Sequence, residues 1–183
     1  MYIFYATGEF INAISECTKA IESEDNTEEV SAYLLRGWSY GDQEKHDLAV
    51  SDFSKVIEMN PNSYDAYSGR ASSYWAEGNY ELAISDFSKT IEIDPENKKG
   101  DFGRGTAYAA IKKYEVAMSD FDKAIEMDPS FSAAYYLRGK YLSSIGDYAS
   151  AINDFNAVIS NNPNFESAYF NRGCVYVAQV IMN

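Results

Sequence analysis

The sequence predicts an all-α fold, an α-solenoid in which 34-residue helix–turn–helix repeats stack into a superhelix. Prolines recur every 34 residues, and an Asp-Phe pair precedes each proline by the same interval: Asp52-Phe53 before Pro61, Asp86-Phe87 before Pro95, Asp120-Phe121 before Pro129, and Asp154-Phe155 before Pro163. Arginine and alanine recur in the same register, at Arg36, Arg70, Arg104, Arg138 and Arg172, and at Ala49, Ala83, Ala117 and Ala151. A fixed period of this length is the mark of a stacked-repeat protein.

The register divides the chain into four full repeats between two partial ones. The predicted boundaries are 1–29 for a partial repeat, 30–63, 64–97, 98–131 and 132–165 for full repeats, and 166–183 for a single helix of a last partial repeat. One pair of helices cannot bury its apolar face alone, so we expect all repeats to form one solenoid domain. Eleven helices are expected, and the first is a stub before Gly8.

The first partial repeat is expected to hold one amphipathic helix. The segment Gly8–Ser15 aligns with Gly78–Ser85, and apolar residues from Phe10 to Ile21 fall on one helical face. The acidic link Glu22–Glu29 is two residues longer than the later links.

Each full repeat is expected to hold two helices that end near its proline. The clearest repeat places helices over 63–76 and 80–93 with Gly78-Asn79 as the turn, and the repeat before it places them over 30–41 and 47–59. Proline cannot continue a helix, and the Asn and Ser residues beside Pro61 can cap the next one. Two turns depart from the pattern: Gly41 comes early in one, and Lys112-Lys113 replaces the glycine in the other. A last helix is expected from Phe165 to about Ile181.

The amino-acid composition argues against some classes of function. Hydrophobic residues make up 46% of the 183 residues and aromatic residues 15%, which is enough to bury a core. The formal net charge of −13 argues against a nucleic-acid partner, because phosphate binding needs a basic face. The same charge argues against an anionic membrane surface, and no stretch approaches the roughly 18 apolar residues of a membrane span.

The chain has few cysteine and histidine residues, which are common in catalytic and metal sites. Cys17 and Cys174 lie near opposite ends of the chain, which makes a disulfide between them improbable in an extended array. His46 is the single histidine and occupies a slot that later repeats fill with tyrosine, so packing explains it better than catalysis. We expect no catalytic residue, metal or cofactor, and the simplest interpretation is a soluble cytoplasmic protein.

Six positions of the repeat carry a family resemblance. One repeat supplies them as Tyr33, Gly37, Tyr40, Ala49, Phe53 and Pro61, and the next as Tyr67, Ala71, Tyr74, Ala83, Phe87 and Pro95. The third supplies Gly105, Tyr108, Ala117, Phe121 and Pro129, with Asp101 in place of the first aromatic, and the fourth supplies Tyr135, Gly139, Ala151, Phe155 and Pro163, with Leu142 in place of the second. The chain resembles the tetratricopeptide-repeat (TPR) proteins, whose repeat has this spacing.

The chain departs from the family where Leu usually precedes the Gly, because each repeat has Arg there. A buried lone arginine would be costly. We therefore expect structural ion pairs with the aspartate of the second helix: Arg36/Asp52, Arg70/Asp86, Arg104/Asp120 and Arg138/Asp154. The competing interpretation is a row of arginines for an acidic ligand.

The resemblance implies that first helices line a concave groove that holds a partner segment. The groove positions of the family fall on Leu34, Trp38, Ser68, Ser72, Trp75, Phe102, Thr106, Tyr136, Lys140, Phe170 and Cys174, which should point away from the core of each helix pair. Chaperone-binding members of the family clamp a terminal carboxylate with Lys, Asn and Arg, but here only Lys99 and Lys140 are cationic nearby. The groove therefore suits an apolar or aromatic peptide. Alternatively, Trp38, Trp75 and Phe102 only pack between helices.

The leading hypothesis is a non-enzymatic module that binds a protein or peptide. The alternatives are a scaffold that assembles with copies of itself through its terminal helices, and a regulatory part of a larger protein. Both ends of the chain are apolar, at Met1–Tyr5 and over Cys174–Met182, although terminal repeats normally present a polar face. We therefore expect either a fragment of a longer array or ends that are buried in an assembly.

Overall fold

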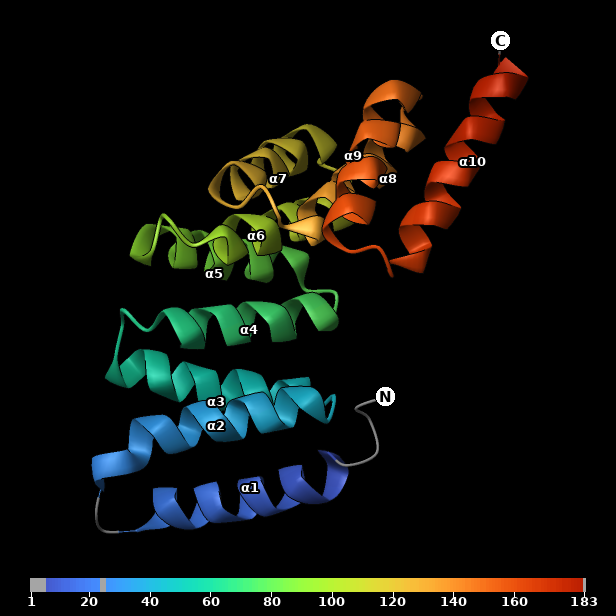
Figure 1. Cartoon of the computed structure of the whole chain (residues 1–183). Coiled ribbons are helices and arrows are strands. Elements are labelled where there is room, and N and C mark those ends of the chain that lie inside the picture. Colours follow the sequence, from blue (N-terminus) through green and yellow to red (C-terminus); the bar gives the residue numbers. More distant parts are fainter. Residues whose placement is uncertain (1–5, 24–25, 183) are drawn as a thin grey trace. The chain divides into compact units, whose positions relative to one another are not determined.

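The computed structural model describes residues 6–23 and 26–182, and these residues form helices with no β-strand among them (Figure 1). Contacts divide the chain into two compact units, one ending at Pro95 and one beginning at Glu96. The first unit contains α1 (Ala6–Glu22), the short 3-10 helix η1 (Asn26–Glu28), α2 (Glu29–Asp42), α3 (His46–Met59), α4 (Tyr64–Ala76) and α5 (Tyr80–Ile93). The second contains α6 (Lys98–Ala110), α7 (Tyr114–Met127), α8 (Ser132–Ser144), α9 (Tyr148–Asn161) and α10 (Glu166–Met182).

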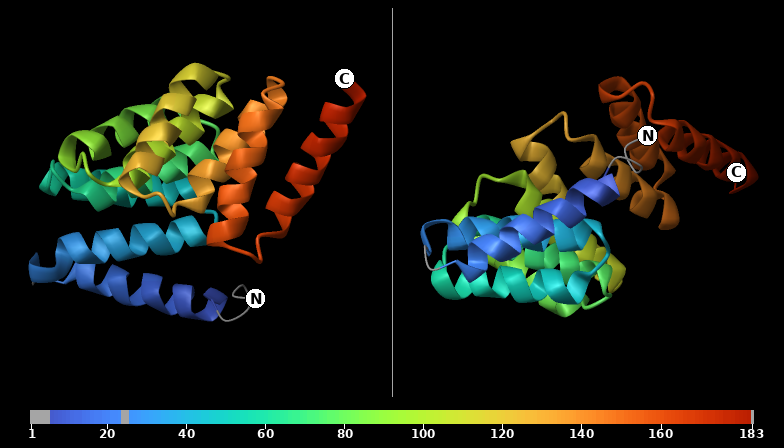
Figure 2. Two further views of the ribbon diagram at one scale, coloured as in Figure 1. Left: turned by 45° about the horizontal axis from the view of Figure 1, so that its top comes forward. Right: turned by 90° about the horizontal axis from the view of Figure 1, so that it is seen from below.

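In the unit that ends at Pro95, each helix packs on the next one along the chain. The pairs α2/α3 and α4/α5 form the repeats, α1 packs on α2, and α3 packs on α4. Figure 1 shows α1 to α4 as successive layers, and Figure 2 shows again that α1 and α2 lie side by side. The core lies between these layers and includes Ala49, Phe53, Val56 and Ala66.

Small residues set the helix spacing in this unit. A Cβ atom on Gly37 would lie 2.9 Å from the Phe53 ring, and a Cβ atom on Gly69 would collide with the same ring. The two glycines therefore let α2 and α4 both approach the Phe53 ring of α3 closely. The sequence analysis assigned Ala71 as the small residue of α4, whereas the structure shows that Gly69 also makes a close approach.

The unit that begins at Glu96 repeats this arrangement. The pairs α6/α7 and α8/α9 form its repeats, and α10 packs on α9 and α8, beside which it lies in Figure 2. A Cβ atom on Gly105 would lie 3.0 Å from the Phe121 ring, and one on Gly139 would lie 3.1 Å from the Phe155 ring. Buried clusters form around Phe155 with Leu142, Ala151 and Val175, and around Ala124 with Ile125 and Ala134.

The turn inside each repeat has one residue in the left-handed backbone region. Gly78 and Gly146 occupy it with φ of 80° and 84°, and Glu44 and Lys112 occupy the equivalent places with φ of 60° and 61°. Left-handed φ is costly for residues with a Cβ atom and ordinary for glycine. The repeat with the early Gly41 thus keeps the common turn geometry and places Glu44 in the strained position.

These observations confirm the all-α repeat fold. The predicted stub before Gly8 differs, because Ala6 and Thr7 belong to the first turn of α1. The predicted helix tail at Met1–Tyr5 lies outside the described residues. The boundaries of the repeats, their union in one solenoid domain and the superhelical path stay predictions. None of the helices over 6–23 and 26–182 combines the length and apolar character that a bilayer crossing requires.

Candidate functional site

Four arginines on first helices each bind the aspartate on the second helix of the same repeat. Each uses Nε and Nη2 to donate to the two carboxylate oxygens, at 2.7 and 2.8 Å for Arg36/Asp52, 2.7 and 2.9 Å for Arg70/Asp86, 2.9 and 2.7 Å for Arg104/Asp120, and 2.9 and 2.6 Å for Arg138/Asp154. All four aspartates are buried, and the hydrogen bonds that Arg70 donates to Asp86 raise the pKa of Arg70. This two-point geometry is the strong form of the Arg–carboxylate contact.

In Arg36, Arg70, Arg138 and Arg172, Nη1 reaches the preceding repeat, a contact that the sequence analysis missed. Its acceptor lies two residues after that repeat's aspartate position. The pairs are Arg36 Nη1 with Thr18 Oγ1 at 3.0 Å, Arg70 Nη1 with Ser54 Oγ at 3.0 Å, Arg138 Nη1 with Asp122 Oδ1 at 2.7 Å, and Arg172 Nη1 with Asn156 Oδ1 at 2.5 Å. Each of these arginines therefore joins two repeats, and this favours a structural role over an acidic ligand.

Asp101 breaks the pattern at Arg104. Arg36, Arg70, Arg138 and Arg172 lie over tyrosine rings three residues earlier, at 5.3 to 5.6 Å from the ring centroids. At the equivalent place Asp101 is buried, with Oδ1 3.7 Å from Arg104 Nη2 and no hydrogen bond to that oxygen within the described residues. Burial and the nearby charge of Asp120 raise the pKa of Asp101.

In the first unit, the predicted groove residues vary in exposure. Trp38 is 40% exposed and contacts the Phe53 ring edge-on at 5.1 Å between centroids, while Trp75 is 42% exposed and contacts Tyr80 at 6.5 Å. Ser72 is exposed and Ser68 is half-buried. Leu34 instead packs against the Phe53 cluster.

In the second unit, two of the predicted groove aromatics are packing residues. Phe102 contacts Phe121 and Phe131 at 6.0 and 4.9 Å between ring centroids. Tyr136 contacts Phe155 at 6.1 Å. The expectation that all groove side chains point away from the core is therefore too broad, because the larger ones also fill space between neighbouring helices. The other predicted positions are more open: Thr106 is half-buried, and Lys140, Phe170 and Cys174 are exposed.

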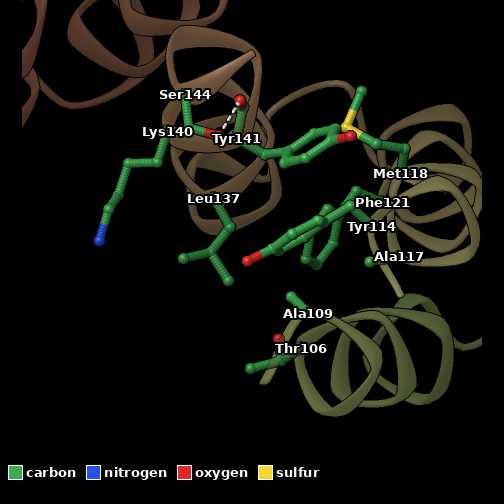
Figure 3. Close-up of a pocket in the computed structure, with 10 residues that line it drawn as sticks. All are labelled: Thr106, Ala109, Tyr114, Ala117, Met118, Phe121, Leu137, Lys140, Tyr141 and Ser144. Atoms are coloured by element: carbon green, nitrogen blue, oxygen red, sulfur yellow. Dashed lines mark hydrogen bonds between the residues drawn. The ribbon is translucent and has the colours of Figure 1, made fainter. Parts of the chain in front are cut away.

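The second unit has an apolar cavity of about 320 Å³ between α6, α7 and α8. It is lined by Thr106 and Ala109 of α6, by Tyr114, Ala117, Met118 and Phe121 of α7, and by Leu137, Lys140, Tyr141 and Ser144 of α8. The rings of Tyr114 and Tyr141 stack at 4.7 Å between centroids and form one wall. Figure 3 shows the apolar side chains gathered between the three helices, with the Lys140 ammonium group at the edge of the set.

Two predicted groove residues, Thr106 and Lys140, thus both line this cavity. The sequence analysis did not predict most of the other residues that line it. A signal was present for Tyr114, which stands in the turn-aromatic slot of Tyr80 and Tyr148. Ala109 lines the open space, and its equivalent 34 residues earlier is Trp75.

A smaller cavity of about 170 Å³ lies in the first unit, lined in part by Trp38, His46 and Ser72. His46 Nδ1 is buried and makes no hydrogen bond within the described residues. Both cysteines are free thiols, and burial raises the pKa of Cys17. Within residues 6–23 and 26–182, no three His, Cys, Asp or Glu side chains are grouped so that they could hold a metal ion.

Comparison with known proteins identifies the family. A model described as tetratricopeptide repeat matches residues 34–98 and 70–134, and a second model of the same description matches residues 121–153. The chain therefore belongs to the tetratricopeptide repeat family. No curated protein matches it.

Solved structures of TPR proteins share the fold. MamA has a TM-score of 0.77 at 21% identity, covering 87% of this chain and 92% of its own. YrrB, described as a TPR protein with an unusual peptide-binding site, has a TM-score of 0.71 at 24% identity, covering 89% and 83%. The first TPR of Spaghetti, solved with the HSP90 peptide SRMEEVD, has a TM-score of 0.62 at 26% identity, covering 64% and 93%.

Proposed function

We propose that this chain is a protein–protein interaction module and that an apolar or aromatic side chain of its partner enters the cavity between α6, α7 and α8. The observation that carries the proposal is the cavity itself, with its stacked Tyr114 and Tyr141 wall and its open place beside Ala109. Its volume of about 320 Å³ falls in the range of roughly 300–1,000 Å³ that is usual for binding pockets. One similar TPR structure is solved with a bound peptide and another is described as having a peptide-binding site, which supports the coarser part of the proposal.

The chemistry of the walls selects the partner. Met118, Phe121 and Leu137 offer apolar surface, so transfer of an apolar side chain from water is the main favourable term. Lys140 is the single cation of this lining, and it lies 5.7 Å from the centroid of the Tyr136 ring. One lysine can pair with an acidic group of the partner next to the side chain that enters the cavity. It cannot form the Lys, Asn and Arg set of a carboxylate clamp.

The chain itself suggests how to close the cavity without disturbing the fold. Trp75 occupies the position equivalent to Ala109 and packs beside Tyr80, which is the equivalent of Tyr114. Ala109→Trp therefore places an indole where another repeat already carries one. Ala110→Trp is the matched control, because Ala110 is exposed and is not part of the cavity lining.

The test is selection of random peptides on the full chain, followed by titration of the selected peptides against each variant. We expect selected peptides to share an apolar or aromatic residue, and Ala109→Trp to weaken their binding at least tenfold while Ala110→Trp leaves it unchanged. Thermal melts of both variants should stay close to that of the parent chain. Equal binding to Ala109→Trp, or selected peptides that need only a free carboxyl terminus, would overturn the proposal.

A further inference from the structure

Helix α10 presents the surface that the second helix covers in the full repeats. Arg172 bonds Asn156 of the preceding repeat and lies over Tyr169, as the other arginines do with their neighbours. It has no carboxylate partner in the part of the chain that the structure describes, whereas Arg138 in the preceding repeat binds both oxygens of Asp154. The Nε side of Arg172 is thus available for an acidic group.

The surface of α10 beside Arg172 is also not covered by other side chains of the described residues. A Cβ atom on Gly105 or Gly139 would meet a phenylalanine ring at 3.0 or 3.1 Å, but a Cβ atom on Gly173 would meet nothing within 4 Å. Tyr176 is 48% exposed, whereas its equivalent Leu142 is 8% exposed. Further along the helix, Val177 and Val180 are 61% and 78% exposed. Within the described residues of α10, the uncovered surface is therefore apolar and has one cation, Arg172, beside it.

Helix α1 has the complementary arrangement, because it aligns with the second helices of the repeats. Ala13 and Glu16 precede Ala49 and Asp52 by the same 36 residues. Thr18 already receives Arg36 of α2, as Ser54 receives Arg70. In the full repeats the aspartate of the second helix also accepts hydrogen bonds from the arginine of its own first helix; within the described residues Glu16 of α1 receives no arginine, so this contact is unused.

The unused face of α1 is exposed. The Glu16 side chain is 71% exposed and accepts a hydrogen bond from Lys19 of the same helix. Ala13 is half-buried although its equivalents Ala49, Ala83 and Ala151 are fully buried, and the exposed Glu9 lies on the same helical face. A face with two carboxylates beside the small Ala13 thus stands on α1, and an apolar face with one guanidinium beside it stands on α10.

We propose that copies of this chain associate head to tail, with α1 of a second copy docked on α10 so that Glu16 of the second copy pairs with Arg172. The new pair of helices would reproduce the α8/α9 arrangement, with Cys17 of the second copy facing Gly173. The charges are complementary, and the repeat register aligns Glu16 with the aspartates that bind arginine in the full repeats, which favours this register over others. A contact between two different faces gives either a closed ring or an open filament, and both form increasingly as the concentration rises.

Charge reversal tests the pairing. Sedimentation velocity of the full chain over a concentration series should show association that grows with concentration. Arg172→Glu and Glu16→Arg should each shift association to at least tenfold higher concentration. Lys55→Glu is the matched control: it makes the same charge change as Arg172→Glu at an exposed site on α3, and it should associate like the parent chain.

Mixing the two variants gives the sharpest outcome. Every junction in an alternating array of Arg172→Glu and Glu16→Arg chains pairs opposite charges, so an equimolar mixture should associate at the parent concentration. A parent chain that stays a monomer at all concentrations, or a mixture that associates no better than its components, would overturn the proposal. Circular dichroism of each variant checks folding, and Glu16→Arg is exposed enough to preserve it. None of these readouts depends on the cavity between α6, α7 and α8.

Discussion

Arg70 donates from Nε and Nη2 to the two carboxylate oxygens of Asp86, at 2.7 and 2.9 Å, and both side chains are largely buried. The same guanidinium also reaches Ser54 of the preceding repeat at 3.0 Å. A buried arginine requires this degree of compensation, because an unpaired charge away from water is costly.

Asp86→Ala should lower the free energy of unfolding by about 1–3 kcal/mol, because it leaves the Arg70 charge buried without its carboxylate. Urea denaturation measures the change, and a double-mutant cycle with Arg70→Met isolates the coupling between the two side chains. A coupling energy of zero would contradict the pairing. Ser54→Ala is the milder control, since it removes one hydrogen bond and no charge.

Lys112→Gly should raise the free energy of unfolding by about 1 kcal/mol, because Lys112 has a φ of 61° that glycine adopts without a Cβ penalty. The reverse change, Gly146→Lys, should lower it by a similar amount, since Gly146 has a φ of 84° at the equivalent place. Thermal or urea unfolding measures both. A destabilised Lys112→Gly variant would show that contacts of the lysine side chain outweigh the backbone strain.

Asp101→Asn should stabilise the protein at pH 7, with a gain that shrinks as the pH falls toward about 4, the usual pKa of aspartate, and is absent below it. Burial, and then the charge of Asp120, raise the pKa of Asp101 in the folded state. The folded state therefore binds this proton more tightly than the unfolded state, and the parent chain loses stability as pH rises between the two pKa values. The asparagine side chain does not titrate, so the variant does not lose this stability as the pH rises. Melting temperatures measured across the pH range for both chains give the comparison, and parallel curves would contradict the assignment.

Trp75→Ala should cost less stability than Phe87→Ala. Trp75 is 42% exposed and Phe87 is 7% exposed, so the phenylalanine change leaves a cavity that should cost roughly 3–5 kcal/mol. Equilibrium unfolding of the two variants under the same conditions measures the difference. An equal loss would make Trp75 a core residue and would remove it from the candidate groove.

The sequence predicted the repeat fold well because its strongest signals are local and periodic. Proline after each second helix, and small residues such as Gly105 and Gly139 at fixed offsets, act in the same way in each repeat. The constant spacing of 16 residues between arginine and aspartate also made the ion pairs predictable.

The candidate site was less predictable because a cavity depends on the sizes of side chains from several helices and not on a repeating sequence pattern. The cavity is lined by side chains from three helices, among them Ala109 at the position that Trp75 holds in the repeat before. Phe102 and Tyr136 occupy groove positions of the family yet turn into aromatic clusters. The left-handed backbone at Glu44 was not predicted, because no glycine stands at that position of the sequence.

The contact from each arginine to the preceding repeat has a consequence for how the repeats unfold. In a nearest-neighbour description of a repeat array, such contacts belong to the interface term that makes adjacent repeats melt together. The acceptors are not equal: Ser54 is neutral, whereas Asp122 gives Arg138 a second carboxylate with a half-exposed side chain. Added salt screens exposed charge pairs more than neutral hydrogen bonds. The cooperativity between α7 and α8 should therefore weaken with ionic strength, while that between α3 and α4 should not.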